Sequence, residues 1–277
     1  MERARRTADR RRVGTGAPGV TALAVLAVAA AVAYVTAAVH LCLRGDFWPA
    51  TRVFAFCGGA VSVAAAALAP LPGGAFTVHM GQHVLLGMVA PLLFVLGRPV
   101  TLAFRALRPG SPRRLLLRLV HSRPAGWLVF PPVAALLDVG GLWVLYRTPL
   151  FAATHEHPWL HALVHFHVLV AGILFTASVL QLDPLRRRYG LVLRGVTLVA
   201  ASAAHGVLAK TLYLSAPPHV SFADVPRGAE LMYYGGDVVE IALAVVLALG
   251  WYAEAGRRYR AAGSQPAAAG SVTAGRR

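Results

Sequence analysis

Long uncharged apolar runs alternate with short clusters of charged and turn-forming residues along this chain of 277 residues. Runs of close to 20 apolar residues are long enough to cross the roughly 30 Å hydrocarbon layer of a bilayer as helices. A transmembrane barrel would need alternating segments of about 10 residues, and that alternation is absent. The pattern therefore predicts an all-α integral membrane protein, a bundle of seven transmembrane helices. The predicted spans are 19–41, 53–70, 77–97, 125–146, 159–181, 191–214 and 230–252.

The same pattern divides the chain into one membrane domain and two tails. We predict a basic disordered tail at 1–17, a transmembrane domain at 18–255 and a disordered tail at 256–277, because the ends are rich in Gly, Ala, Ser and Arg. Pro91 and the pair Pro131-Pro132 fall inside predicted spans, where proline breaks the helical hydrogen-bond ladder. Kinks are therefore expected at these prolines.

Composition excludes several classes of protein. Hydrophobic residues make up 57% of the chain and charged residues 14%, against about 25% charged in soluble domains. The net charge of +16 comes almost entirely from arginines that flank apolar runs. That placement is typical of topology signals and contacts with anionic lipids, and it argues against nucleic-acid binding. The only cysteines, Cys42 and Cys57, form no disulfide framework and are interpreted as core thiols.

Arginines gather in the connections that share one side of a seven-span chain. The opposite loops hold only Arg147 and Arg227. Because cytoplasmic loops carry an excess of arginine, we expect the N-terminus outside, the C-terminus in the cytoplasm, and anionic lipids at the cytoplasmic face of the cell membrane. The arginines of the predicted cytoplasmic side are Arg44, Arg52, Arg98, Arg105, Arg108, Arg113, Arg114, Arg118, Arg123, Arg186, Arg187, Arg188, Arg257, Arg258 and Arg260.

The first thirteen residues oppose this orientation, because their many arginines should resist export. Either the helix count is off by one, or this tail is not part of the mature protein. We favour the second interpretation, a start-site error, since Val13 and Val20 are positions where a non-ATG start could lie.

Ionisable side chains share one depth in five of the predicted spans. At a rise of 1.5 Å per residue they lie about 10–12 Å below the predicted outer surface. Ionisable residues inside a membrane are costly and are usually functional. The residues at this level are His83, His165, His205, Asp138 and Asp237, with Glu240 a turn deeper.

The histidine spacing indicates a metal site. His79 and His83, and likewise His161 and His165, are separated by four residues, so each pair projects from one helix face. Two such pairs on facing helices can converge on one ion. Imidazole suits copper, zinc and iron, and the thioether of Met80 favours Cu(I). Neighbouring carboxylates could orient the imidazoles from behind.

Simpler interpretations hold for other residues. A single histidine within a span often donates only a helix–helix hydrogen bond, which we expect for His40, His121 and His167. The sequence holds no HExxH, GxSxG or Walker A motif, so no hydrolytic enzyme is indicated.

Several motifs resemble the CtaG-type cytochrome c oxidase assembly factors of bacteria, over about residues 20–255. The most specific is His79-Met80-Gly81-Gln82-His83, followed by Val89-Ala90-Pro91-Leu92-Leu93 and Leu96-Gly97-Arg98-Pro99-Val100. Other similar segments are Arg44-Gly45-Asp46 with Trp48-Pro49, His155-Glu156 leading to His161 and His165, His205-Gly206, and Glu230-Leu231-Met232-Tyr233-Tyr234-Gly235-Gly236-Asp237. The chain departs from the family in its basic tail and in Arg227-Gly228-Ala229-Glu230, where many members are rich in Asp and Gln.

This resemblance implies a seven-helix protein that assists the maturation of haem–copper oxidases. It implies a non-catalytic role, with copper bound at the outer face and delivered to cytochrome c oxidase subunits. The ligands that carry over are His79, Met80, His83, His161 and His165, with His205 and Asp237 as further candidates. Two alternatives remain open from the residues: a copper transporter, and a membrane redox protein that binds b-haem through paired histidines.

Overall fold

The computed structural model describes residues 18–215, 220 and 222–263. The predicted tail 1–17 and the last part of the predicted tail 256–277 lie outside these residues. The described residues form helices and no strand, which confirms the predicted all-α class. The last helix, α14 (Val225–Gly263), continues past residue 255, where the sequence predicted the end of the transmembrane domain.

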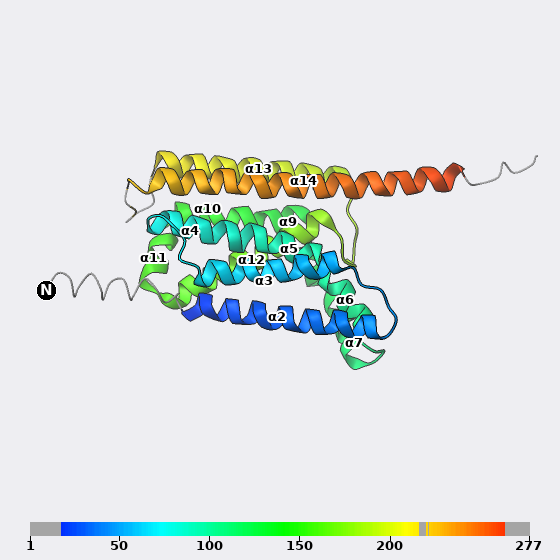
Figure 1. Cartoon of the computed structure of the whole chain (residues 1–277). Helices are drawn as coiled ribbons and strands as arrows, with labels where there is room; N and C mark the ends of the chain where they lie inside the picture. The colour runs from blue at the N-terminus through cyan, green and yellow to red at the C-terminus, as the bar shows by residue number, and fades with distance from the viewer. Residues whose placement is uncertain (1–17, 216–219, 221, 264–277) are drawn as a thin grey trace, which may run out of the picture.

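The other helices are named in chain order in Figure 1. Two short segments, η1 (Val84–Val89) and η2 (Leu136–Gly140), are π-helical, a form that appears mostly as single-turn bulges and often at functional sites. The α-helices are α2 (Pro18–Leu43), α3 (Ala50–Leu68), α4 (Ala75–His83), α5 (Ala90–Leu96), α6 (Pro99–Ala106), α7 (Ser111–Val120), α8 (Arg123–Leu128), α9 (Pro131–Ala135), α10 (Gly141–Arg147), α11 (Leu150–Glu156), α12 (Pro158–Leu180) and α13 (Leu191–Leu214).

Among the described residues, six helices are long and apolar enough to cross a membrane. A seventh crossing is present if Pro131–Arg147 and Leu150–Glu156, which meet at a bend of 76°, count as one span. Six to seven spans therefore agree with the predicted bundle, and the fourth predicted span is the broken one. The six continuous spans are Thr21–Leu43, Ala50–Leu68, Ala75–Ala106, Pro158–Leu180, Leu191–Leu214 and Val225–Ala261.

The prediction of a kink at Pro131-Pro132 is wrong. Phe130 is extended, with φ −70° and ψ 120°, so the chain leaves the helix there and α9 begins at the two prolines. Proline is favoured in a first helical turn, because its missing N–H has no intrahelical partner there anyway. Pro91 also lies in the first turn of a helix, α5, directly after the π-helical η1.

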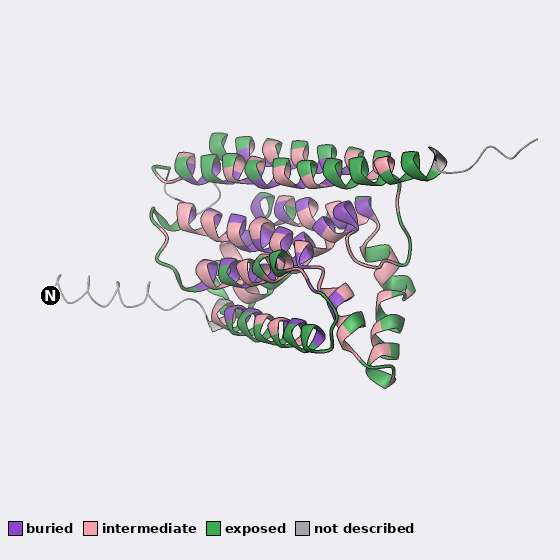
Figure 2. Ribbon diagram, turned by 45° about the vertical axis from the view of Figure 1, so that its right-hand side comes forward, coloured by how far each residue is buried: buried purple, intermediate pink, exposed green. Residues whose placement is uncertain are grey.

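The spans pack side by side into one bundle (Figure 1). Helices α2 and α3 pair along one side, α13 and α14 pair along the opposite side, and α12 contacts helices of both pairs. Side chains on the outer flanks are exposed and apolar (Figure 2), as at Val25, Val196 and Ile241, which are 64%, 62% and 63% exposed. Such flanks match the hydrocarbon of a bilayer.

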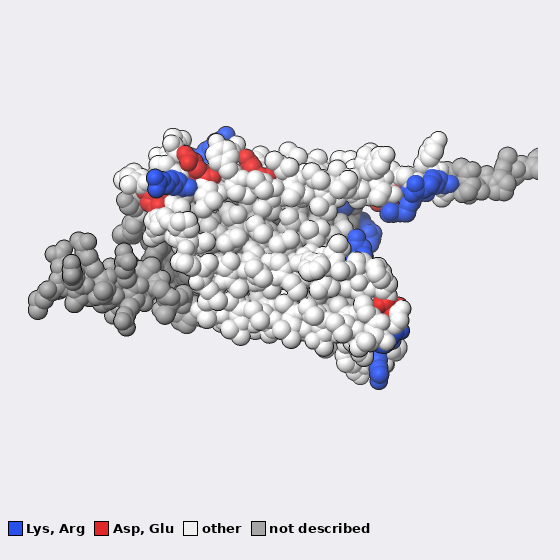
Figure 3. Space-filling view, viewed as in Figure 1, with Lys and Arg blue, Asp and Glu red and all other residues white. Residues whose placement is uncertain are grey.

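Charged side chains gather toward the two ends of the bundle and leave a largely uncharged band between them (Figure 3). The end where Gly74 meets Asp224 is called here the histidine end. The end where Val100 meets Asp183 is called the arginine end. The amphipathic helix α7 lies at the arginine end and buries none of its residues.

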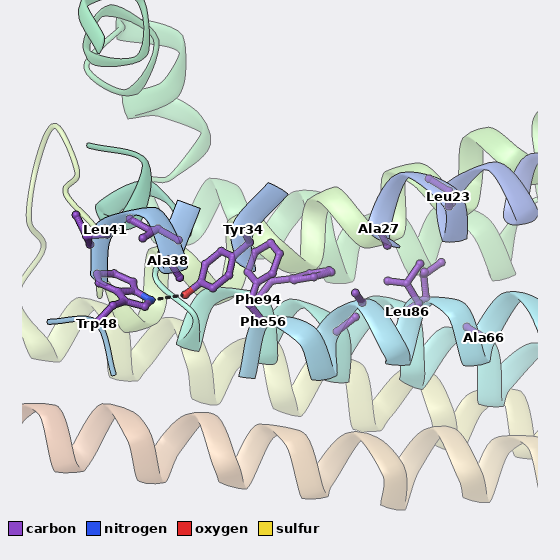
Figure 4. Packing of buried hydrophobic residues seen from close by; sticks show 14 residues of the cluster. Leu23, Ala27, Tyr34, Ala38, Leu41, Trp48, Phe56, Ala66, Leu86 and Phe94 are labelled. Carbon is purple, nitrogen blue, oxygen red and sulfur yellow. Dashed lines mark hydrogen bonds between the residues drawn. The ribbon is translucent and has the colours of Figure 1, made fainter. Parts of the chain in front are cut away.

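Aromatic packing holds the half of the bundle near the arginine end (Figure 4). Phe56 stacks on Tyr34 with ring centroids 4.1 Å apart and packs at a tilt on Phe94 at 4.9 Å. The Tyr34 hydroxyl donates to the carbonyl of Gly97 at 2.6 Å and accepts from Trp48 Nε1 at 3.1 Å. The buried hydroxyl is therefore fully used.

A carboxylate from a distant connection caps one helix at each end. Asp224 accepts from the backbone N–H of Phe76 at 2.7 Å and from the Thr77 hydroxyl at 2.5 Å, at the start of α4. Burial alone would raise the pKa of Asp224, but these hydrogen bonds outweigh it and hold that pKa below its ordinary value. Asp183 accepts from the N–H and hydroxyl of Thr101 at 2.8 and 2.5 Å, at the start of α6.

Candidate metal centre

Three predicted ligands converge near the histidine end. His79 from α4 and His161 and His165 from α12 each offer a ligand atom, and these atoms lie within 4.8 Å of one another. The rings of His161 and His165 are 4.2 Å apart, and those of His79 and His165 are 5.9 Å apart. We call these residues the histidine triad. Helical spacing brings His161 and His165 to one face, and α4 adds His79 from the facing side.

Hydrogen bonds decide which nitrogens of the triad point at the shared space. His165 Nδ1 lies 2.9 Å from the carbonyl of His161, and a carbonyl only accepts, so Nδ1 carries the proton. The lone pair of His165 Nε2 is therefore free to bind a metal. His161 Nδ1 is buried without a partner among the described residues, which is costly unless a ligand uses it.

Tyr146 of α10 links the triad to the predicted thioether ligand. Its hydroxyl lies 3.0 Å from His79 Nε2 and 3.9 Å from the sulfur of Met80. If His79 donates from Nε2, the hydroxyl donates on to Met80, and Nδ1 of His79 keeps its lone pair for a metal. Met80 itself is fully buried and packs in an apolar cluster with Met232. Its sulfur thus lies behind Tyr146.

An open groove of about 730 Å³ lies at the histidine end. Its lining includes Phe151 and His155 of the bent segment α11. The ring of Phe151 contacts His155 on one side at 4.9 Å and His79 on the other at 5.1 Å. Phe151 therefore separates the groove from the triad, while His155 Nδ1 bonds to the carbonyl of Phe151 at 3.0 Å.

The remaining predicted histidine ligands lie together at a deeper position. The rings of His83 and His205 are 5.9 Å apart. His205 Nδ1 lies 3.1 Å from a carboxylate oxygen of Glu240. Asp138 lines the same cavity as these three residues. We call His83, His205, Glu240 and Asp138 the deep cluster.

Asp237 does not join either group. It forms no hydrogen bond or ion pair with the described residues, whereas Glu240, one turn further along α14, contacts His205. Gly236 allows the contact between His205 and Glu240, since a side chain at position 236 would collide with the His205 ring. Gly236 lies one turn before Glu240 on the same helix face, so the His205 ring can approach α14 beside Glu240.

Tyr146, Asp138 and Glu240 lie at these clusters and are absent from the predicted ligand set. A tyrosine in a mostly apolar span needs a partner for its hydroxyl, and that need was the available signal. His167, expected to be structural, bonds through Nε2 to the carbonyl of Leu137 at 3.1 Å, within η2.

The fold and this site define a class, the polytopic helical membrane proteins with a buried histidine cluster. The sequence profile of the cytochrome c oxidase caa3 assembly factors, Caa3_CtaG, matches residues 32–254. The chain therefore belongs to this family. The match takes in every residue of the triad and of the deep cluster.

Curated relatives add no function. The uncharacterized proteins Mb0105 of Mycobacterium bovis and MT0111 of Mycobacterium tuberculosis are each 36% identical over 170 residues. The uncharacterized protein ML1998 of Mycobacterium leprae is 34% identical over 172 residues. Each alignment covers 58% of this chain and 26% of the relative, so the chain matches about a quarter of their length. No solved structure matches the chain.

Proposed function

We propose that this chain binds Cu(I) at the histidine triad and passes it to subunits of a cytochrome c oxidase during assembly, without catalysing a reaction. Family membership carries the assembly role. The observation that carries the copper role is the convergence of His79, His161 and His165 within 4.8 Å. Neutral imidazoles suit copper. The Met80 thioether, which would favour Cu(I) as a ligand, lies behind Tyr146 and would reach the ion only if that hydroxyl moved.

The triad lies close to an open groove, and delivery of a metal would need a path between them. The groove beside Phe151 opens at the histidine end, and only the Phe151 ring and its neighbours separate it from His79. A purely structural metal site would be closed on all sides. With a path past these side chains, an ion could enter and leave from the histidine end.

We further propose that the histidine end faces outside and the arginine end the cytoplasm of a bacterial cell membrane. The support is the arginine distribution (Figure 3), since cytoplasmic loops carry more Lys and Arg. Helix α7 adds to it with exposed Leu115 and Leu119, 56% and 59% exposed, beside Arg114 and Arg118. Such a helix lies at an anionic lipid surface.

Two rival functions have less support. A haem needs a pocket of several hundred Å³, whereas the cavities beside these histidines measure about 10 and 20 Å³. A transporter needs polar steps across the whole membrane, but beyond Glu240 the inward face of α14 continues with Leu243 and Leu247 in an apolar cluster. A Soret band in the purified protein would restore the haem alternative.

Copper binding by the purified full-length protein tests the proposal. Titration with Cu(I) against a coloured Cu(I) chelator should give tight binding that His161→Ala weakens by about 100-fold or more, since a ligand is removed. The double variant His161→Ala with His79→Ala should add little, because one ion has already lost its site. His121→Ala is the control, since His121 bonds only to its own helix at Leu117. Unchanged binding in the double variant would refute the copper site.

The assembly role has its own test in cells. Deleting the gene should lower oxidase activity through loss of copper from the oxidase, while its haem persists at least in part. The His161→Ala variant should fail to complement, and added copper should partly restore activity. Full copper occupancy of the oxidase in the deletion strain would refute the role.

A further inference from the structure

The deep cluster surrounds a small cavity inside the bundle that the histidine triad does not line. The cavity measures about 20 Å³, enough for one ion or one water, since a water needs about 10–15 Å³ by this measure. His83, His205, Glu240 and Asp138 line it, among apolar side chains such as Leu142 and Phe175. Such a cavity in an otherwise apolar interior needs an occupant that satisfies its polar walls.

Two histidines present unpartnered nitrogens there. His205 is 2% exposed, and its Nδ1 donates to Glu240, so the lone pair of its buried Nε2 has no partner. His83 is 7% exposed, and neither of its ring nitrogens has a partner among the described residues. A buried polar atom left unpaired costs about 1–3 kcal/mol. A neutral imidazole keeps one lone pair, so His83 and His205 together offer two lone pairs to a ligand.

The carboxylates complete a recognisable metal-binding arrangement. Glu240 bonds to the far nitrogen of His205, as carboxylates do behind metal-bound histidines, where they fix the tautomer and raise basicity. Asp138 lines the cavity and forms no hydrogen bond or ion pair with the described residues. It is thus free to be a direct ligand.

Both π-helical segments meet at this cavity. Gly87 and Met88 of η1 and Asp138 and Val139 of η2 line it. Side chains from other helices bond to carbonyls of these turns: Ser62 donates to Leu85 at 2.9 Å, beside the backbone N–H of Ala90, and His167 bonds to Leu137. The bundle therefore maintains two irregular turns at this cavity, which agrees with a binding site.

We propose that the deep cluster is a second metal site, separate from the triad, that takes a divalent transition-metal cation. His83, His205 and Asp138 are the ligands, and Glu240 orients His205. Charge separates the two sites. The triad is neutral and suits a monovalent ion, whereas Asp138 and Glu240 together balance two positive charges in a medium where net charge is costly.

The ligand atoms of the deep cluster are more widely spaced than those of the triad, so binding of an ion must draw His83, His205 and Asp138 closer together. Only the triad brings three described His, Cys, Asp or Glu ligand atoms within 4.8 Å of one another. His83 also lines the small cavity that His79 and His165 line, so it stands between the two sites. Whether metal passes between them rests on the proposed copper function, whereas the second site rests on the geometry of the deep cluster alone.

Metal titrations of the stripped, full-length protein in detergent test the proposal, with Co(II) as the divalent probe and its visible d–d bands as the readout. We expect one Co(II) bound, with the bands retained when one equivalent of Cu(I) is added. Glu240→Gln should weaken Co(II) about 10–100-fold, the range for loss of a carboxylate behind a histidine ligand. Asp138→Asn should weaken it more, and both should leave Cu(I) binding within about twofold.

Matched controls lie on the same helix or at a similar depth. Glu254→Gln, at the exposed end of α14 where Glu254 pairs with Arg258, and Asp237→Asn should both leave Co(II) binding unchanged. Thermal unfolding of each variant reports that it is folded. His161→Ala should lose Cu(I) and keep Co(II).

The outcomes are separable. Absence of Co(II) binding, or Co(II) binding that Glu240→Gln and Asp138→Asn leave unchanged, overturns the second site and leaves the copper proposal standing. Displacement of Co(II) by one equivalent of Cu(I) overturns the separation of the sites. Binding of Co(II) that depends on Asp138, in a protein that binds no Cu(I), supports the second site and refutes the copper proposal.

Discussion

The two halves of the bundle are packed by different chemistry. Near the arginine end, aromatic rings fill the interior, and the buried Tyr34 hydroxyl has both a donor and an acceptor. Near the histidine end, histidine rings lie among apolar side chains, and nitrogens of His83, His161 and His205 lack partners among the described residues. Toward the arginine end, the buried atoms without such partners are the Nε atoms of Arg113 and Arg194, two side chains that keep other guanidinium nitrogens for bonding. Unpaired polar atoms lower the stability of a fold. The aromatic side chains near the arginine end therefore stabilise the bundle, whereas the unpaired histidines near the other end destabilise it but are available to bind a ligand.

The capping carboxylates show that this difference lies in the interior and not in the frame. Asp224 and Asp183 each hold a helix start through backbone N–H groups and a threonine hydroxyl, at opposite ends of the bundle. Both ends therefore use the same device, while the side chains between them differ. Stability and metal binding should respond separately to mutation in the two halves.

The largest expected loss of stability comes from the aromatic half. Phe56→Ala removes a ring that is 8% exposed and contacts both Tyr34 and Phe94. Replacement of a buried Phe by Ala costs about 3–5 kcal/mol. Thermal or denaturant unfolding in detergent should show this loss, while Cu(I) stoichiometry stays the same. His161→Ala is the counterpart, with lost copper and little change in stability. If Phe56→Ala and His161→Ala lowered copper binding equally, the two halves of the bundle would not differ in their roles.

A close helix crossing should come next. A side chain at Gly172 of α12 would collide with the backbone carbonyl of Gly87 in η1. Gly172→Ala should therefore cost about 1–3 kcal/mol, as overpacking does. Gly250→Ala is the control, because a Cβ there meets nothing within 4 Å. If both variants unfold at the wild-type temperature, the crossing is looser than described.

The two caps should contribute smaller and similar amounts. Asp224→Ala and Asp183→Ala should each cost about 1 kcal/mol at neutral pH, the usual value of a helix cap. The Asp224 contribution should depend on pH. Its folded-state pKa is lowered, so the contribution is fully present above the unfolded pKa, about 4, and is lost as pH falls through the folded pKa. Melting curves of wild type and Asp224→Ala should therefore converge in acid, and a gap that widens in acid would contradict this.

The smallest effect on copper binding is expected at the link between the triad and Met80. Tyr146→Phe removes the hydroxyl that lies between His79 Nε2 and the Met80 sulfur. Loss of a partner behind a metal ligand should weaken Cu(I) by about tenfold. Tyr233→Phe serves as control, since the Tyr233 ring contacts Lys210 and not the triad. A loss of 100-fold in Tyr146→Phe would make the hydroxyl itself a candidate ligand.

The spans were predictable because apolar length alone encodes them. The predicted runs 159–181 and 191–214 match Pro158–Leu180 and Leu191–Leu214 to within a residue. The fourth span was not predictable in the same way, since composition does not reveal that Phe130 is extended and that Pro131 starts a helix. Hydropathy measures how much of a segment is apolar and does not show where its helical hydrogen bonds are interrupted.

The grouping of the site residues was not predictable. Uniform helical rise placed His83, His165 and His205 in one predicted layer, whereas the structure groups His165 with His79 and His161, and His83 with His205. A regular helix was assumed, however, and π turns change which face later residues occupy. Those turns depend on partners far along the chain, such as Gly172 against Gly87 and Ser62 against Leu85. One sequence without these contacts could not separate the triad from the deep cluster or choose Glu240 over Asp237.

The π turns also determine how these helices would respond to the deletion of one residue. Each holds one residue more per turn than the α-helix on either side, and one α-helical residue turns the chain by about 100°. Deleting a single residue from η2 would let the helix close into regular α form with almost no loss of length. The shortened turn would still complete one rotation, so the residues after it would keep their facing and Tyr146 would still lie beside His79. The bulge itself, which brings Asp138 and Val139 to the wall of the deep cavity, would disappear. The spans could still cross the membrane, so hydropathy would register no change in a protein whose deep cavity had lost part of its wall.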